Sequence, residues 1–254
     1  MAVFPYTENR DFDPLGGGPL DGSPPNAQAL AAIWPEVHCP SFEGSPYVDP
    51  TTKTEAITNY KAIGATHLES LNVASPNPTV PRYAPDSGRH PDGAIYPGSR
   101  HGVDGFANDG TSRTILLVET VEQNVARWTV GNETCVVALP PTVTFEKAAG
   151  DYWHPTGYTA DRFWDRSTIP AGINKTYLNW DYDAIPYDDG GISTPSAAAS
   201  GPIKYGPSSH HKGVTNHCFA DGNVRSLNND IDAALYMFLT TRDNGDPTTN
   251  MSED

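Results

Sequence analysis

The sequence predicts a loop-rich, β-containing fold with few helices, and three observations support this prediction. The chain has 23 glycines and 24 prolines among 254 residues, a density that interrupts helices and favours ordered loops. Two short strand-like runs, 214–220 and 223–227, flank Asp221-Gly222, which predicts a β-hairpin with a two-residue type I′ turn. Apolar residues recur at helical spacing after Asp230, so we expect one helix near the C-terminal end.

The composition excludes some classes of partner. A net charge of −15 repels nucleic acid and anionic lipid, and it attracts cations such as Ca²⁺. No apolar run reaches the roughly 18 residues of a membrane span, and no signal peptide is recognisable. The chain has three cysteines, Cys39, Cys135 and Cys218, and their spacing matches no zinc or Cys-x-x-Cys motif. One disulfide with one free thiol is therefore possible.

The chain divides into an arm, a body and a tail. Residues 1–36 form the arm, with a short helix expected over 27–34 behind an Asn26 cap. The body is expected to be a single domain over residues 37–246, followed by an acidic tail, 247–254. Long irregular loops are expected inside the body at residues 75–109 and 140–204.

The strongest strand is predicted over residues 114–120, as a continuous apolar run buried on both faces. Glu119 lies at its end, where a buried carboxylate is costly unless it is paired or coordinated. Either an ion pair with Arg113 or Arg127, or a role in a site, would satisfy it. Further strands are expected over residues 58–64, 125–130 and 134–139.

The C-terminal helix is expected to be capped by Asp230 and to end at Asn244-Gly245. Its apolar residues fall on one face, which should pack against the sheet close to the hairpin. They are Ile231, Ala234, Leu235, Phe238 and Leu239.

The hairpin region holds the densest set of candidate chemical groups. His217 and Asn216 are neighbours on a strand and therefore point to opposite faces. A metal site would accordingly use His210 or His211 with a carboxylate distant in sequence. If the protein is an enzyme, the candidate catalytic residues are His211, Asp221 and Glu119, the two acids acting as an acid/base pair.

An aromatic and acidic stretch over residues 152–189 allows two interpretations. Trp164, Trp180 and Tyr182 would line a carbohydrate-binding surface, or the same aromatics would anchor long loops onto a small core.

Four blocks of the sequence resemble a large planctomycete-type family of unknown function. Members of that family carry a prepilin-type N-terminal cleavage/methylation segment and a pseudopilin-G-like body. The blocks are Cys39-Pro40-Ser41; Thr58-Asn59-Tyr60 with Gly64; Asp109-Gly110-Thr111-Ser112-Arg113-Thr114-Ile115-Leu116 with Glu119; and His211-x-Gly213-Val214-x-Asn216 with Ala220-Asp221-Gly222-x-Val224-Arg225.

The resemblance implies an α+β, pseudopilin-like fold with an antiparallel sheet, a C-terminal helix and long irregular loops. It also implies export to the periplasm, the cell surface or the extracellular space. The family usually opens with Phe-Thr-Leu-Val-Glu on a long apolar helix, which is not found here, so we expect a truncated or secreted form. Some pseudopilins bind Ca²⁺ through an acidic C-terminal loop. The resemblance therefore implies that the Ca²⁺ ligands in this chain would be Asp243, Asn244 and Asp246.

Three functional hypotheses follow. The first is a non-enzymatic surface protein that associates with itself, with other surface proteins or with glycans, and that has either no cofactor or Ca²⁺. The second is a secreted hydrolase, either glycosidase-like or metal-dependent. The third is a carbohydrate-binding module. Because no Gly-x-Ser-x-Gly or His-Glu-x-x-His motif is present, the first is favoured.

Overall fold

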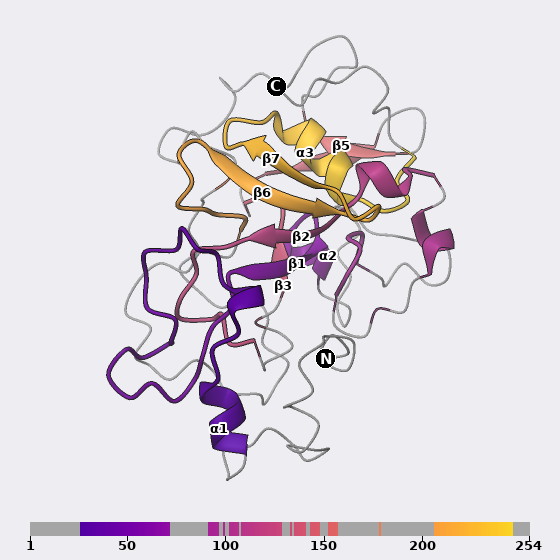
Figure 1. Ribbon diagram of the computed structural model, residues 1–254. Helices are drawn as coiled ribbons and strands as arrows, with labels where there is room; N and C mark the ends of the chain where they lie inside the picture. Colours follow the sequence, from indigo (N-terminus) through magenta and orange to yellow (C-terminus); the bar gives the residue numbers. More distant parts are fainter. Residues whose placement is uncertain are drawn as a thin grey trace.

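The computed structural model describes residues 26–71, 91–96, 99, 102–106, 108–128, 133, 135–140, 143–147, 152–156, 178 and 206–245. These residues form an α+β structure, as predicted, with a five-stranded sheet, a two-stranded sheet and short helices (Figure 1). Among the residues described, no helix combines the length and the apolar character needed to cross a membrane.

The larger sheet has the strand order β3-β1-β2-β6-β7. Its pairs are antiparallel except β1 with β3, which run parallel, so the expected antiparallel sheet is in fact mixed. The strands are β1 (Tyr60–Ala65), β2 (Ile115–Glu119), β3 (Cys135–Val137), β6 (Val214–Phe219) and β7 (Val224–Asn228).

The remaining elements are short. The second sheet pairs β4 (Phe145–Lys147) with β5 (Trp153–Pro155). The α-helices are α1 (Asn26–Ala31), α2 (Leu68–Leu71) and α3 (Ala233–Thr240). The 3₁₀ helices are η3 (Pro35–Val37), η4 (Val103–Phe106) and η5 (Thr111–Arg113). The helix expected over 27–34 therefore begins at its predicted cap and ends three residues early.

A β-bulge in β2 decides which side chains reach the core. The pairing with β6 shifts register between Ile115 and Leu117, so Ile115 and Val118 both enter the core although they are three residues apart. Leu117 is 37% exposed, and the prediction of a strand buried on both faces is wrong at this position. Glu119 follows Val118 and so points away from the core, to the face that carries the candidate site.

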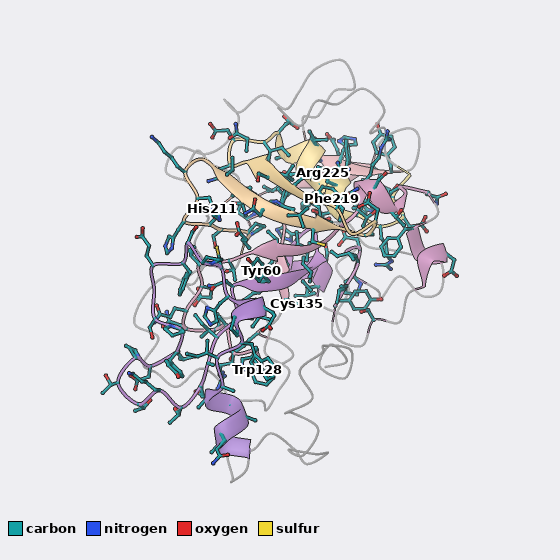
Figure 2. All side chains as sticks on the ribbon, viewed as in Figure 1. Tyr60, Trp128, Cys135, His211, Phe219 and Arg225 are labelled. Carbon is teal, nitrogen blue, oxygen red and sulfur yellow. The ribbon has the colours of Figure 1, made fainter. Side chains whose placement is uncertain are left out.

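The β6–β7 hairpin is confirmed, but its turn differs from the prediction. The Gly222 N–H donates to the Phe219 carbonyl, and Phe219 N–H donates to the Asn223 carbonyl. Gly222 has φ +84°, whereas Asp221 does not have positive φ. This is a three-residue loop with a glycine bulge, because only one residue adopts the left-handed conformation that type I′ requires of two. The guanidinium carbon of Arg225 lies 4.3 Å from the centroid of the Phe219 ring, on its face (Figure 2).

The C-terminal helix α3 is confirmed, with three corrections, the first being that it ends at Thr240 and not at Asn244-Gly245. Its cap is Asp232, whose carboxylate accepts from the N–H groups of Ala234 and Leu235, whereas Asp230 lies in the turn after β7. All eight helix residues are buried, not one face alone. The second sheet explains this burial, because Tyr152, just before β5, packs edge-on against Phe238 on the helix.

The strand predicted over 125–130 is wrong in the described part of that segment, which forms turns and one isolated bridge at Arg127. The cause is competition from side chains. The Glu122 carboxylate accepts from the Val125 N–H (3.0 Å), and the buried Lys61 ammonium donates to the Val125 carbonyl (2.6 Å). These peptide groups are therefore bonded to side chains instead of a neighbouring strand.

Candidate functional site

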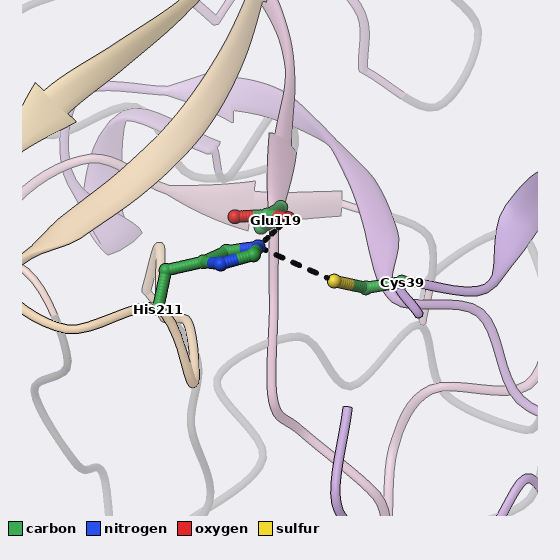
Figure 3. Close-up of side chains that lie close together, drawn as sticks. All are labelled: Cys39, Glu119 and His211. Carbon is green, nitrogen blue, oxygen red and sulfur yellow. Dashed lines mark hydrogen bonds and ion pairs between the residues drawn. The ribbon is translucent and has the colours of Figure 1, made fainter. Parts of the chain in front are cut away.

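Cys39, Glu119 and His211 come together from three distant parts of the chain (Figure 3). Cys39 follows η3, Glu119 ends β2, and His211 precedes β6. His211 Nε2 lies 3.2 Å from Glu119 Oε1 and 3.5 Å from Cys39 Sγ. The side chains of these three residues form what we call the Cys-Glu-His cluster.

Asn59 fixes the position of Cys39 against the sheet. Its side-chain oxygen accepts from the Cys39 N–H (3.2 Å), and its side-chain amide donates to the Thr120 carbonyl (3.2 Å). The Asn59 backbone N–H donates to the Val37 carbonyl. One fully buried asparagine thus ties the segment around Cys39 to the end of β2, next to Glu119.

Glu119 is 2% exposed, and its two oxygens have different partners. Oε2 accepts from the Asn216 N–H (2.9 Å) and from the Ser209 hydroxyl (3.1 Å), while Oε1 faces His211. Burial alone would raise the pKa of Glu119, but hydrogen bonds from Asn216, Cys39 and Ser209 together hold it below its ordinary value. Glu119 is therefore a carboxylate at neutral pH.

The predicted ion pair between Glu119 and Arg127 is wrong, because Arg127 pairs with Glu55 and Glu133. Arg113 lies in η5, which precedes β2, whereas Glu119 is the last residue of that strand.

His211 contacts both partners through one ring nitrogen. In a nucleophile–histidine–acid relay, the two ring nitrogens face the nucleophile and the acid separately. Here Nε2 faces both Cys39 Sγ and Glu119 Oε1. The geometry is therefore three donor atoms converging on a small volume, not a relay that moves a proton away from a thiol.

The thiol of Cys39 is not activated by its surroundings. Burial raises its pKa, and the nearby Glu119 charge raises it further, against hydrogen bonds from Ser41 and Tyr60 that lower it. Burial, with Cys39 and Glu119 close by, likewise raises the pKa of Tyr60 to about 12. A neutral thiol is a weak nucleophile, and the same thiol must lose its proton before it can bind a metal ion, so these surroundings do not prepare Cys39 for attack on a substrate.

The Cys-Glu-His cluster is the one group of three metal-ligating side chains found among the residues described, and its three donor atoms lie within 4.8 Å of one another. His211 and Glu119 were predicted as candidates, whereas Cys39 was considered only as a small buried residue or a disulfide partner. Each of the three lies in a different one of the blocks that carry the family resemblance, and this shared feature was the available signal.

The structure gives His210 and His217 other partners. His210 Nδ1 accepts from the Glu43 N–H (3.0 Å), and its ring stacks on Phe42, so it does not join His211. His217 is 1% exposed on the core face, where Nε2 bonds the Tyr236 hydroxyl (2.8 Å). Burial lowers the pKa of His217 to about 4, which leaves it neutral at physiological pH.

Glu119 and Asp221 are not brought together. Asp221 lies at the hairpin tip, where its carboxylate accepts from the Asn223 N–H (3.0 Å) and side-chain amide (2.9 Å). The Asp221 N–H donates to the Thr111 carbonyl, before the first residue of β2, whereas Glu119 is the last residue of that strand, whose first and last residues lie about 13 Å apart at 3.3 Å per residue. The acid/base pair of a glycosidase needs carboxylates about 5–9.5 Å apart.

The predicted calcium ligands are only partly described. The Asn244 side chain pairs with the backbone N–H and carbonyl of Trp153, so its amide links the C-terminal segment to β5. Asp243 is half-buried, and Asp246 lies outside the described residues. A calcium site at these three positions stays a prediction.

The structure leaves the aromatic prediction untested but answers the question of a disulfide. Trp164, Trp180 and Tyr182 lie outside the described residues, so the carbohydrate platform stays a prediction. All three cysteines are free, and the disulfide left open by the sequence is not formed. Burial raises the pKa of the Cys135 thiol to about 12, as for a small residue of the core.

Comparison with known protein families finds a match. The family described as protein of unknown function (DUF1559) matches residues 17–234, most of the chain. The chain therefore belongs to that family. No curated protein and no solved structure is significantly similar to it.

Proposed function

We propose that the chain is an exported, non-enzymatic structural or interaction protein with a pseudopilin-like body. Its location is the periplasm, the cell surface or the extracellular space. The resemblance of its four sequence blocks to prepilin-type proteins supports export, and the net charge of −15 is compatible with a well-solvated surface protein. Its partners are other copies of itself, other surface proteins or glycans.

The observation that carries this proposal is the structural use of the polar residues around the hairpin. Four of the polar groups there bond to the fold itself: His210 to the backbone of Glu43, Asn216 to Glu119, His217 to Tyr236, and Asp221 to Asn223. Arg225 also donates to the Ser112 carbonyl (2.9 Å), which joins β7 to η5. A hairpin that organises the surrounding loops is what an interaction scaffold needs, because its binding surface is carried on those loops.

The proposal is tested in the cells that produce the protein. Intact cells are treated with a protease that cannot enter them, and the chain is followed by antibody in cytoplasmic, periplasmic, membrane and medium fractions. We expect the chain outside the cytoplasm, and a membrane-impermeant crosslinker should convert it to larger adducts. A chain confined to the cytoplasm and protected from the protease would overturn the proposal.

The enzymatic alternative has its own control. A panel of glycoside, ester and peptide substrates is tested with the native chain and with Glu119→Gln, which removes the buried one of the two candidate catalytic carboxylates. Turnover that disappears in Glu119→Gln would replace the structural proposal with the hydrolase hypothesis.

A further inference from the structure

We propose that Cys39, Glu119 and His211 bind a divalent transition-metal ion of the zinc class, with the fourth coordination position left to water or an external ligand. This inference goes beyond the proposed function and does not depend on it, because the site would exist in an interaction protein or in an enzyme.

The donor set selects the class of metal. The cluster offers one sulfur, one imidazole nitrogen and one carboxylate oxygen. Ca²⁺ and Mg²⁺ prefer oxygen ligands alone, whereas Zn²⁺ and Co²⁺ accept sulfur, nitrogen and oxygen in one site. Three protein ligands with an open fourth position are typical of reactive zinc sites, and four protein ligands are typical of structural ones.

The distances fit a tetrahedral ion. Ligand atoms bonded to zinc at about 2.0–2.3 Å lie about 3.3–3.8 Å from one another in a tetrahedron. His211 Nε2 lies 3.5 Å from Cys39 Sγ and 3.2 Å from Glu119 Oε1. All three donor atoms fall within 4.8 Å, so small side-chain rotations suffice to place them around one ion.

Outer hydrogen bonds already orient the ligands. The Ser209 hydroxyl donates to Glu119 Oε2 and accepts from the backbone N–H of His211 (3.0 Å), so one side chain holds the Glu119 carboxylate and the His211 backbone. The Asn216 N–H holds the same carboxylate oxygen, which leaves Oε1 directed at the cluster. Asn59 anchors the backbone of Cys39. Such supporting contacts are characteristic of metal sites, where they fix the first-shell ligands.

The site is also accessible. The side chain of Glu119 is 3% exposed and that of His211 is 31% exposed, so the cluster has a buried floor and an open side. A cation can enter from solvent at His211, and the ion would join segments that are up to 172 residues apart in sequence. Metal binding should therefore stabilise the folded chain as well as occupy the site.

The test uses Co²⁺ as a spectroscopic substitute for Zn²⁺ on the full chain, purified in chelator and then dialysed. Cobalt bound to a thiolate gives a sulfur-to-metal charge-transfer absorption that carboxylates and imidazoles do not give. We expect this absorption to saturate at one Co²⁺ per chain, to disappear on addition of Zn²⁺, and to be accompanied by a rise in Tm.

Matched variants identify the ligands. Cys39→Ser should abolish the absorption, and Glu119→Gln and His211→Ala should each weaken binding by more than about 100-fold. Ser209→Ala removes an outer contact and should weaken it by about 10–100-fold. Cys218→Ser is the control, since it makes the same change at another half-buried free thiol, and it should leave both the absorption and the affinity unchanged.

Two results would overturn the inference. One is an absorption that survives Cys39→Ser, and the other is native chain that shows no thiolate–cobalt absorption at millimolar Co²⁺. If Cys39→Ser fails to fold, X-ray absorption at the zinc edge of the native chain decides the question. One sulfur with two or three nitrogen or oxygen neighbours supports the site, whereas a shell without sulfur excludes it.

Discussion

Replacing Glu119 by glutamine removes the charge at the centre of the cluster and keeps the length of the side chain. In the native protein Oε2 accepts hydrogen bonds from the Asn216 N–H (2.9 Å) and the Ser209 hydroxyl (3.1 Å), and Oε1 faces His211. Glutamine offers one neutral oxygen in place of two charged ones, and its NH₂ group can donate a hydrogen bond but cannot accept one. Losing about one charge-assisted hydrogen bond should lower the free energy of unfolding at pH 7 by about 1.5–3 kcal/mol.

The pH dependence gives this prediction a second, independent signature. The folded protein holds the pKa of Glu119 below its ordinary value of 4.5, so the unfolded chain takes up the proton first as the pH falls. The stability that the carboxylate contributes is therefore complete above about pH 4.5 and is lost as the pH falls through the folded pKa. The difference between the native chain and Glu119→Gln should shrink over the same range.

The assay is equilibrium unfolding in urea, with chelator present so that bound metal does not contribute. It is run from pH 3 to pH 7 on the native chain, on Glu119→Gln and on Glu43→Gln. Glu43 is exposed, so the same chemical change there should alter stability by less than about 0.5 kcal/mol. Equal stability of Glu119→Gln and the native chain at pH 7, or a difference that persists unchanged to pH 3, would refute the reasoning.

Four further predictions concern the hairpin and helix α3. Asp232→Ala removes the carboxylate that accepts from the N–H groups of Ala234 and Leu235, and it should lower the free energy of unfolding in urea by about 0.5–2 kcal/mol. An unchanged free energy of unfolding would show that Asp232 is not the residue that caps the helix. Gly222→Ala should cost about 1–2 kcal/mol in the same measurement through backbone strain alone, because an added Cβ meets no atom within 4 Å at φ +84°. Tyr236→Phe leaves His217 Nε2 without its hydroxyl partner and should cost about 1–3 kcal/mol. The pKa of His217, about 4 against an ordinary 6.5, means that the unfolded chain binds this proton first; its contribution to stability is full above pH 6.5 and declines towards pH 4. An NMR titration of the native imidazole with a midpoint close to 6.5 would contradict that burial effect.

Local patterns in the sequence were sufficient to place several elements. The run that becomes β2, the two arms of the β6–β7 hairpin and the apolar residues of α3 are all found close to their predicted positions. Each depends on neighbours in sequence: β-branched and apolar runs, a turn with a glycine, and a helical repeat. The errors lie where a distant group competes, as at Val125, whose carbonyl accepts from the buried ammonium of Lys61.

The candidate site shows the same division. The sequence indicated that Glu119 needed a partner and that His211 was free to turn towards a distant carboxylate, and the structure joins these two residues. It did not indicate Cys39, because a single cysteine far from the hairpin has no local feature that distinguishes a ligand from a small core residue. The sequence also offered His210 as an alternative to His211, although the loop before β6 directs the His210 ring to Phe42 and the backbone of Glu43.

By itself, then, the sequence determined the fold class, the hairpin, the C-terminal helix and an acidic surface, since these follow from composition and from short-range periodicity. Only the tertiary structure decided which polar groups meet. Cys39 and His211 are 172 residues apart, and their contact depends on Asn59 tying the segment around Cys39 to the end of β2. The bulge in β2 then turns Val118 to the core and Glu119 to the opposite face, where the three donor atoms converge. Such long-range pairing is set by the packing of the whole sheet, which no local stretch of sequence encodes.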